Sequence, residues 1–316
     1  MLSRAIRSSG LFNQMKSIRG FKNAHLKAFA TVDPEALSPK DKGYNLVAGE
    51  WVDSHTTQVL IDPMTGKGMI TLPDTQLDEI KPFVDSLKSC PKYGLHNPYL
   101  NKERYLMYGD ICRKMCEVMY DPEVLEHMTR CLMRAVPKSH QQAQAEILVT
   151  MKFVENYCGD QVRFLARGFT NPGDHAGQMS QGFRWPFGPV GVITPFNFPI
   201  EIAVLQLMGA LFMGNKPLVK PDIRCSFPLE QWVRMMHYCG MPKEDMDFIH
   251  GDGPVMEKIL VQGGARNTLF TGSTAVGEHL SKVLKGRVRL EDGGYDWKVI
   301  GPDVPKNQAD IDYVAW

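Results

Sequence analysis

The sequence has almost no net charge, because 36 Lys and Arg residues stand against 35 Asp and Glu residues. Without a basic excess there is no electrostatic field to hold nucleic acid or an anionic membrane, and we expect neither partner. The chain also lacks any apolar run near the roughly 18 residues that cross a bilayer. Its 316 residues are 43% hydrophobic and 22% charged, a composition typical of a soluble globular protein with a large core.

The cysteines lack the number and spacing of a structural framework. Their count of seven is odd, and no secretory segment precedes them, which excludes a disulfide scaffold. Cys112 and Cys116 are four residues apart on an expected helix, but no second Cys/His pair with zinc spacing accompanies them. Two buried residues on one helical face are the favoured interpretation, and we expect no metal site.

The first thirty residues lack acidic side chains, since none occurs before Asp33. Basic residues and serines fill this segment: Arg4, Arg7, Lys16, Arg19, Lys22 and Lys27, with Ser3, Ser8, Ser9 and Ser17. This composition is typical of a mitochondrial transit peptide over residues 1–30, with a disordered basic tail as the alternative. The mature protein is therefore expected in the mitochondrial matrix.

The first half of the chain predicts short strands followed by helices. Residues 44–52 and 59–72 read as strands around turns. Residues 78–165 carry apolar side chains at three- and four-residue steps, and Pro91, Pro98, Pro122 and Pro137 divide them into separate helices. Residues 170–188 are rich in Gly and Pro and predict a loop or a protruding hairpin, which either joins subunits or merely connects.

From Val190 onward, short apolar strands alternate with helices. This alternation predicts an α/β fold with a doubly wound parallel sheet, preceded by the helical N-terminal part. Ligands of such sheets bind at the carboxyl ends of the strands. The expected strands are 191–193, 218–220, 247–250, 268–271 and 288–290, and the intervening helices begin near Ile200, Ser226, Pro254 and Thr274.

Small, polar or ionisable residues follow all five strands. A hydroxyl and backbone amides at Thr271-Gly272-Ser273, just before the helix that opens at Thr274, favour a phosphate, although a simple helix cap is the alternative. Lys220 could reach a ribose hydroxyl or a phosphate, or be a solvated surface lysine. The pair Gly251 and Gly253 is a weak signal alone. The strand-end groups are Thr194-Pro195-Phe196-Asn197, Lys220-Pro221-Asp222, Gly251-Asp252-Gly253, Thr271-Gly272-Ser273-Thr274 and Glu291-Asp292-Gly293-Gly294.

These groups resemble, in order and approximate spacing, the motifs of the aldehyde dehydrogenase superfamily. The resemblance rests on Thr194-Pro195-Phe196-Asn197-Phe198-Pro199, Lys220-Pro221, Phe270-Thr271-Gly272-Ser273 and Glu291. The run from Leu290 to Asp303 departs from the common Glu-Leu-Gly-Gly-Lys pattern and is similar to the plant and algal type of delta-1-pyrroline-5-carboxylate dehydrogenases, mitochondrial enzymes of proline breakdown. The resemblance to the superfamily covers essentially residues 44–316.

The resemblance implies NAD-dependent oxidation of the aldehyde L-glutamate 5-semialdehyde to L-glutamate by a Rossmann-like domain over residues 40–316. By the match, Asn197 donates its amide to the oxyanion, and Glu291 is the general base that activates water. A homo-oligomer is implied for the full-length enzyme, with 170–188 as its candidate hairpin. The implied cofactor-binding residues are Thr194, Pro195, Phe196, Lys220, Gly251, Gly253, Thr271, Gly272 and Ser273.

The sequence departs from the pattern of the superfamily at two points. Ile223 stands where the superfamily commonly has a ribose-binding Glu, which leaves the choice between NAD and NADP open at this site. No cysteine follows Cys239, whereas the family nucleophile follows the general base. We therefore expect an N-terminal fragment, inactive alone, that lacks most of the catalytic domain. The alternatives are a non-catalytic dinucleotide-binding or subunit-capping module and, disfavoured by the Glu291 run, a related reductase of activated glutamate.

Overall fold

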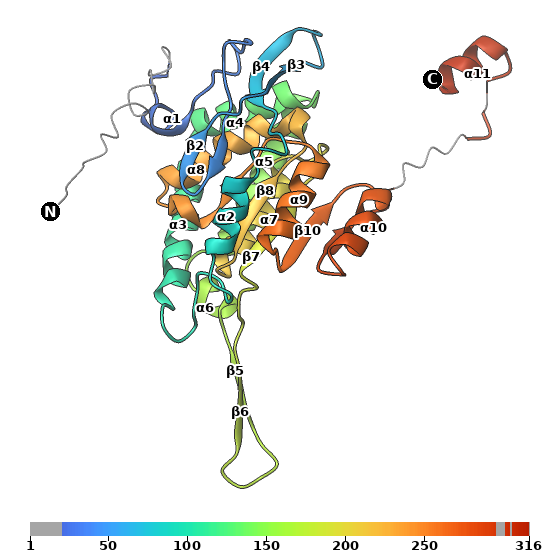
Figure 1. Cartoon of the computed structure of the whole chain (residues 1–316). Helices are drawn as coiled ribbons and strands as arrows, with labels where there is room; N and C mark the ends of the chain where they lie inside the picture. Colours follow the sequence, from blue (N-terminus) through green and yellow to red (C-terminus); the bar gives the residue numbers. More distant parts are fainter. Residues whose placement is uncertain (1–20, 295–300, 304, 316) are drawn as a thin grey trace.

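The computed structural model describes residues 21–294, 301–303 and 305–315 (Figure 1). Residues 1–20, which make up most of the expected transit peptide, lie outside the described residues. So do 295–300 of the run that begins at Leu290.

The N-terminal segment forms the short strands that the sequence predicts. After α1 (Ala24–Phe29), β1 (Asn45–Val47) and β2 (Glu50–Val52) pair antiparallel. The pair β3 (Thr57–Ile61) and β4 (Gly68–Pro73) forms a separate two-stranded sheet. One feature was not predicted: Leu46 of β1 pairs with Phe248, so the β1–β2 hairpin extends the main sheet at its edge.

Five helices follow, as the periodicity predicts. Pro122 lies in the first turn of α4, where Asp121 caps the helix, and Ser139 and Gln142 form a capping box on α5. The prolines thus begin or end helices rather than interrupt them. The helices are α2 (Lys81–Ser89), α3 (Glu103–Met119), α4 (Pro122–Ala135), α5 (His140–Glu155) and α6 (Gln161–Leu165).

The main sheet has the order β11-β10-β7-β8-β9-β1-β2. Its five central and C-terminal strands are mutually parallel. Compared with the prediction, β9 is two residues shorter and β11 lies one residue later. The parallel strands are β7 (Pro189–Ile193), β8 (Lys216–Lys220), β9 (Asp247–Phe248), β10 (Asn267–Thr271) and β11 (Arg289–Glu291).

Helices cover both faces of this sheet, which confirms the doubly wound prediction. One core joins Val192 and Val219 to α3, α5, α7 and α8, and the other joins Leu218 and Phe270 to α2, α9 and α10. All four connecting helices begin within one residue of the predicted position. They are α7 (Glu201–Phe212), α8 (Ser226–Tyr238), α9 (Gly253–Gly263) and α10 (Thr274–Val283), with the short turns η2 (Ile223–Cys225) and η3 (Lys243–Asp245) and the later helix α11 (Gln308–Ala315).

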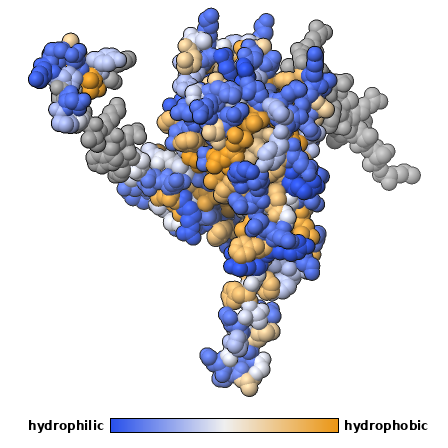
Figure 2. All heavy atoms as spheres, turned by 180° about the vertical axis from the view of Figure 1, so that it is seen from behind, coloured by the Kyte–Doolittle hydropathy of each residue, from blue (hydrophilic) through white to orange (hydrophobic). Residues whose placement is uncertain are grey.

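A hairpin arm extends from the body (Figure 1). It consists of β5 (Phe169–Pro172) and β6 (Met179–Gly182), whose residues are almost all exposed. This confirms the hairpin predicted for 170–188, and its role in joining subunits stays a prediction. From behind, apolar residues gather at the centre of the body, while the arm is largely polar (Figure 2). Within the described residues, no helix combines the length and apolar character needed to cross a bilayer.

Candidate functional site

A cavity of about 1060 Å³ lies at the carboxyl edge of the parallel strands. Its lining comes from the β7–α7 loop, the end of β8, the starts of α9 and α10, the end of β10, and the segment just before α2. The predicted cofactor-binding residues that line it are Thr194, Pro195, Phe196, Lys220, Gly253, Thr271, Gly272 and Ser273. Four of the five predicted strand-end groups thus contribute to the cavity. The segment before α2 joins them, whereas the group from Glu291 to Gly294 does not line the cavity.

Three predicted site residues do not line this cavity. Gly251 is buried and pairs through its backbone with Thr75, so it faces a different neighbour from Gly253. Asn197 is exposed, and its Oδ1 atom accepts a hydrogen bond from the Phe198 amide at 3.1 Å. Glu291 is also exposed, and its Oε2 atom accepts from the Thr271 hydroxyl at 3.4 Å. The roles given to these residues stay predictions.

Lys220 brings a half-buried ammonium group to the cavity. Burial lowers the pKa of Lys220, and the nearby carboxylates of Asp222 and Asp252 only partly counter this. Its Nζ atom donates to the carbonyl of Pro221 at 3.3 Å, and no ion pair to Lys220 occurs among the described residues. The solvated surface lysine considered from the sequence is therefore wrong. An ammonium in this setting gains most from an anionic ligand.

The N-terminus of α10 is not closed by a side chain. Ser273 occupies the cap position with extended backbone angles, yet its hydroxyl makes no capping hydrogen bond. The simple Ser/Thr cap considered as an alternative is thus not formed. The first bond of the helix runs from the Gly277 amide to the Ser273 carbonyl, which leaves the preceding amides outside the helical ladder. Such a terminus favours a phosphate or a carboxylate.

Thr194 supplies a second polar group without a protein partner. Its side chain is buried, and its hydroxyl finds no hydrogen-bond partner within the described residues. The backbone is well placed, because its amide donates to the Lys220 carbonyl at 3.2 Å and its carbonyl accepts from the Asp222 amide at 3.1 Å. These bonds continue the β7–β8 ladder past both strand ends and keep Thr194 beside Lys220.

Asp222 and Arg224 are cavity residues that the sequence argument did not assign. Nε and a terminal nitrogen of Arg224 donate to the two Asp222 oxygens at 2.9 and 2.8 Å, and the guanidinium lies 4.5 Å from the Phe196 ring centroid. Burial raises the pKa of Asp222, but the hydrogen bonds and charge of Arg224 hold it below its ordinary value. The sequence signal that could have assigned Asp222 to the cavity is its acidic side chain two residues after Lys220. Ile223 instead packs on a hydrophobic cluster under η2.

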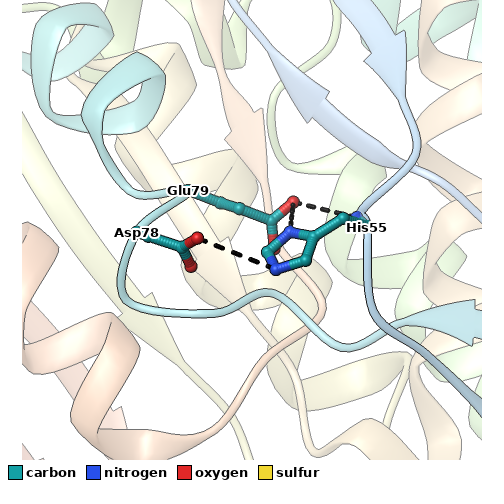
Figure 3. A group of neighbouring side chains, drawn as sticks. All are labelled: His55, Asp78 and Glu79. Carbon is teal, nitrogen blue, oxygen red and sulfur yellow. Dashed lines mark hydrogen bonds and ion pairs between the residues drawn. The ribbon is translucent and has the colours of Figure 1, made fainter.

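An ion-pair clasp joins His55 to Asp78 and Glu79 in the segment just before α2 (Figure 3). His55 Nδ1 lies 3.0 Å from Glu79 Oε1, and His55 Nε2 lies 3.7 Å from Asp78 Oδ2. Glu79 also accepts hydrogen bonds from the Ser54 hydroxyl and from the amides of His55 and Gln76. Asp78 itself lines the cavity. Because donors already occupy both Glu79 oxygens, we interpret the group as a structural clasp rather than a metal site.

The cysteines contribute no thiol to the cavity. None of the seven lines it, and all are free. Burial raises the pKa of the Cys225 thiol, and it raises that of Cys239 to about 12, so neither is an activated nucleophile. Cys112 and Cys116 are buried in the helical core, which confirms the structural interpretation of their spacing.

Most of the chain matches the model of one protein family. The profile described as "Aldehyde dehydrogenase family" matches residues 51–314. The chain belongs to this family. The resemblance drawn from its motifs is therefore confirmed.

Two plant members of the aldehyde dehydrogenase family are similar over almost the whole chain. Delta-1-pyrroline-5-carboxylate dehydrogenase 12A1, mitochondrial, of Arabidopsis thaliana is 51% identical over 99% of the chain and 57% of its own length. A probable aldehyde dehydrogenase of Linum usitatissimum is 52% identical over 100% of the chain and 57% of its own length. The chain thus spans little more than half the length of these relatives.

Solved structures of aldehyde dehydrogenases have the same fold. An aldehyde dehydrogenase of Brucella melitensis biovar abortus superimposes with a TM-score of 0.70 at 25% identity, covering 84% of this chain and 53% of that one. A betaine aldehyde dehydrogenase of Staphylococcus aureus, solved in complex with NAD+, has a TM-score of 0.68 at 19% identity and covers 82% of this chain and 50% of that one. The second likeness concerns the fold alone.

Proposed function

We propose that this chain forms the dinucleotide-binding part of an NAD-dependent L-glutamate 5-semialdehyde dehydrogenase of proline catabolism, acting in the mitochondrial matrix. The observation that carries the proposal is the cavity where Lys220, Thr194 and the open N-terminus of α10 converge. Support for the substrate and the compartment comes from the name of the Arabidopsis relative. The basic composition of residues 1–30 also supports the compartment.

The groups in the cavity fit a dinucleotide. A half-buried ammonium with no ion pair among the described residues and an uncapped helix N-terminus suit a pyrophosphate. The unpartnered Thr194 hydroxyl suits a neighbouring polar group of the same ligand. Lys220, Thr194 and the residues from Thr271 to Ser273 would therefore hold NAD. When bound, NAD supplies the hydride acceptor for oxidation of the aldehyde.

Asp222 favours NAD over NADP in this proposal. A carboxylate at the mouth of the cavity accepts hydrogen bonds from ribose hydroxyls, whereas a 2′-phosphate would place two negative groups side by side. Arg224 does not reverse this preference, because its guanidinium is already engaged by both oxygens of Asp222. Asp222 thus supplies the ribose-binding carboxylate that is missing at position 223, where the chain has Ile223.

Asn197 and Glu291 would act on the substrate. The Oδ1 atom of Asn197 is occupied by the Phe198 amide, which leaves its Nδ2 group as a donor for an oxyanion. The Glu291 carboxylate accepts from the Thr271 hydroxyl and is otherwise open to solvent, as activation of a hydrolytic water requires. Both residues lie at the same sheet edge as Lys220.

The thiol that adds to the aldehyde would come from outside this chain, since none of its seven cysteines reaches the cavity. We therefore propose that the 316-residue chain alone binds dinucleotide without turnover. The exposed hairpin β5–β6 favours a second candidate, in which the chain caps or joins subunits in a homo-oligomer.

Calorimetry with NAD and NADP tests the proposal. We expect NAD to bind the wild-type chain and to bind Lys220→Ala roughly tenfold or more weakly. Lys282→Ala, which removes an exposed lysine outside the cavity, serves as the matched control. Absence of NAD binding would reject the site. Oxidation of L-glutamate 5-semialdehyde by the chain alone would reject the external thiol while leaving the site intact.

A further inference from the structure

A second cavity, of about 670 Å³, lies at the opposite, amino-terminal edge of the parallel sheet. Its walls come from the end of α2 and the loop after it, the start of β7, the end of α9, and the residues just before β10 and β11. Among the residues that the structure describes, no acidic side chain lines it and four cationic ones do: Lys88, Lys92, Arg266 and Arg287.

The backbone places these cations on neighbouring segments. The Arg266 amide donates to the Pro189 carbonyl at 2.9 Å, and the Arg287 carbonyl accepts from the Thr268 amide at 3.0 Å. The two arginines therefore stand at the starts of adjacent parallel strands, about 5 Å apart in the sheet direction. Gly188, with a φ of 104°, admits the backbone of Lys92 against the start of β7, since an added Cβ would lie 3.0 Å from the Lys92 carbonyl oxygen.

Helix ends account for only part of this charge. The C-termini of α2, α9 and α10 gather at this edge, and each carries roughly half a negative charge, together about −1.5. Arg287 responds to one of them, because its Nε atom donates to the Leu284 carbonyl at 3.1 Å. The four positive charges of the cavity exceed the summed negative charge of the three helix ends by more than two. None of the four cations has a carboxylate within ion-pair distance in the part of the chain that the structure describes.

One wall of the cavity is apolar. Leu87, Phe187 and Pro189 line it beside the cations, and the Phe187 side chain is half exposed. Gly264 ends α9 in the left-handed region, and an added Cβ there would meet no atom within 4 Å, so the approach is open. Basic side chains that only compensate the helix dipoles would need no apolar wall beside them.

We propose that this cavity binds a small organic phosphate. Its phosphate would be held by the forked donors of Arg266 and Arg287, assisted by Lys88 and Lys92, and its apolar body would pack on Phe187. Two exposed guanidinium groups on adjacent strands can bind a phosphate through paired hydrogen bonds. The inference does not depend on the dinucleotide site, which lies at the other edge of the sheet.

Calorimetry with 4-nitrophenyl phosphate and with inorganic phosphate tests the proposal on the full chain. We expect the aryl phosphate to bind more tightly than inorganic phosphate. Replacing both arginines (Arg266→Ala with Arg287→Ala) should weaken both ligands roughly tenfold or more. Phe187→Ala should weaken the aryl phosphate alone. Lys88→Gln with Lys92→Gln should also weaken both ligands. Because neither lysine side chain makes a hydrogen bond to the described residues, this variant is the one least expected to unfold the chain.

One control decides the outcome. Lys67→Ala with Lys282→Ala removes the same net charge away from either cavity and should bind as the wild type does. The proposal is overturned if the arginine and lysine variants bind like the wild type. It is equally overturned if the charge control loses as much affinity, because a diffuse surface field would then explain the binding.

Discussion

The carboxylate of Glu146 caps a helix to which it is not connected in sequence: its Oε1 atom accepts a hydrogen bond from the Ile200 amide at 2.9 Å, at the N-terminus of α7. Glu146 is buried, and Lys138 donates to its Oε2 atom at 2.6 Å. The same Lys138 ammonium lies 3.9 Å from the centroid of the Phe198 ring. Two residues from the α4–α5 region thus hold the loop that carries Asn197.

We predict that Glu146→Leu lowers the free energy of unfolding by about 3–5 kcal/mol, because it leaves the part-buried Lys138 ammonium and the Ile200 and Glu201 amides without their acceptor. Urea unfolding followed by circular dichroism measures the change. Glu117→Ala, which breaks an exposed pair with Arg113 on α3, should cost less than about 0.5 kcal/mol. Equal losses in the two variants would show that Glu146 has no special role.

The clasp of His55, Asp78 and Glu79 predicts that the stability of the fold depends on pH, with one limit at low pH and one at high pH. Burial opposes ionisation of Glu79, but hydrogen bonds from Ser54, Gln76 and His55 lower its pKa from 4.5 to about 2, so its contribution is present above pH 4.5 and is lost as the pH falls towards 2. The hydrogen bond to Glu79 raises the pKa of His55 above 6.5, so that contribution is present below pH 6.5 and is lost as the pH rises through the folded-state value.

The stability difference between the wild type and Glu79→Gln should therefore be largest between about pH 4.5 and 6.5. Denaturation at a series of pH values checks this. Asp85→Asn, an exposed site on α2, is the control and should show no such maximum. A difference that stays constant from pH 3 to pH 8 would contradict the assignment.

Gly214 should resist substitution because of what it packs against. Its φ is 85°, and a Cβ there would lie 2.3 Å from the His96 ring. Gly286 has a similar φ of 73° but open space around it. We predict that Gly214→Ala destabilises the chain by at least about 1 kcal/mol more than Gly286→Ala, since both variants share the backbone strain and only the first adds a clash. Equal melting temperatures would show that His96 moves aside freely.

Asp222 should control the choice of dinucleotide. We predict that Asp222→Asn raises the affinity for NADP relative to NAD by roughly tenfold, because the carboxylate that opposes the 2′-phosphate is removed and Arg224 is released from its partner. Titration of both dinucleotides gives the ratio. Glu278→Gln, exposed on α10, controls for the change in net charge. An unchanged ratio would exclude Asp222 from the ribose site.

Much of the candidate site was predictable because strand ends are marked locally. Short apolar runs followed by Thr194-Pro195, Lys220-Pro221 and Thr271-Gly272 are enough to place these residues at one edge of a parallel sheet. Spacing could not separate Gly253, which lines the cavity, from Gly251, which pairs with Thr75. Neither could it show that Asp222 binds Arg224 with both oxygens, because that depends on how η2 turns after the strand.

The sequence by itself determined the alternation of strands and helices, the places where prolines separate helices, and the family, since these follow from apolar periodicity, local backbone preference and contiguous motifs. Only the tertiary structure decided that β1 joins the sheet beside β9, that Glu146 caps α7, and that four cations meet at the amino-terminal edge. Each of these relationships joins residues far apart in the chain, and no local preference encodes which distant partner a backbone amide, a carboxylate or a strand edge will meet.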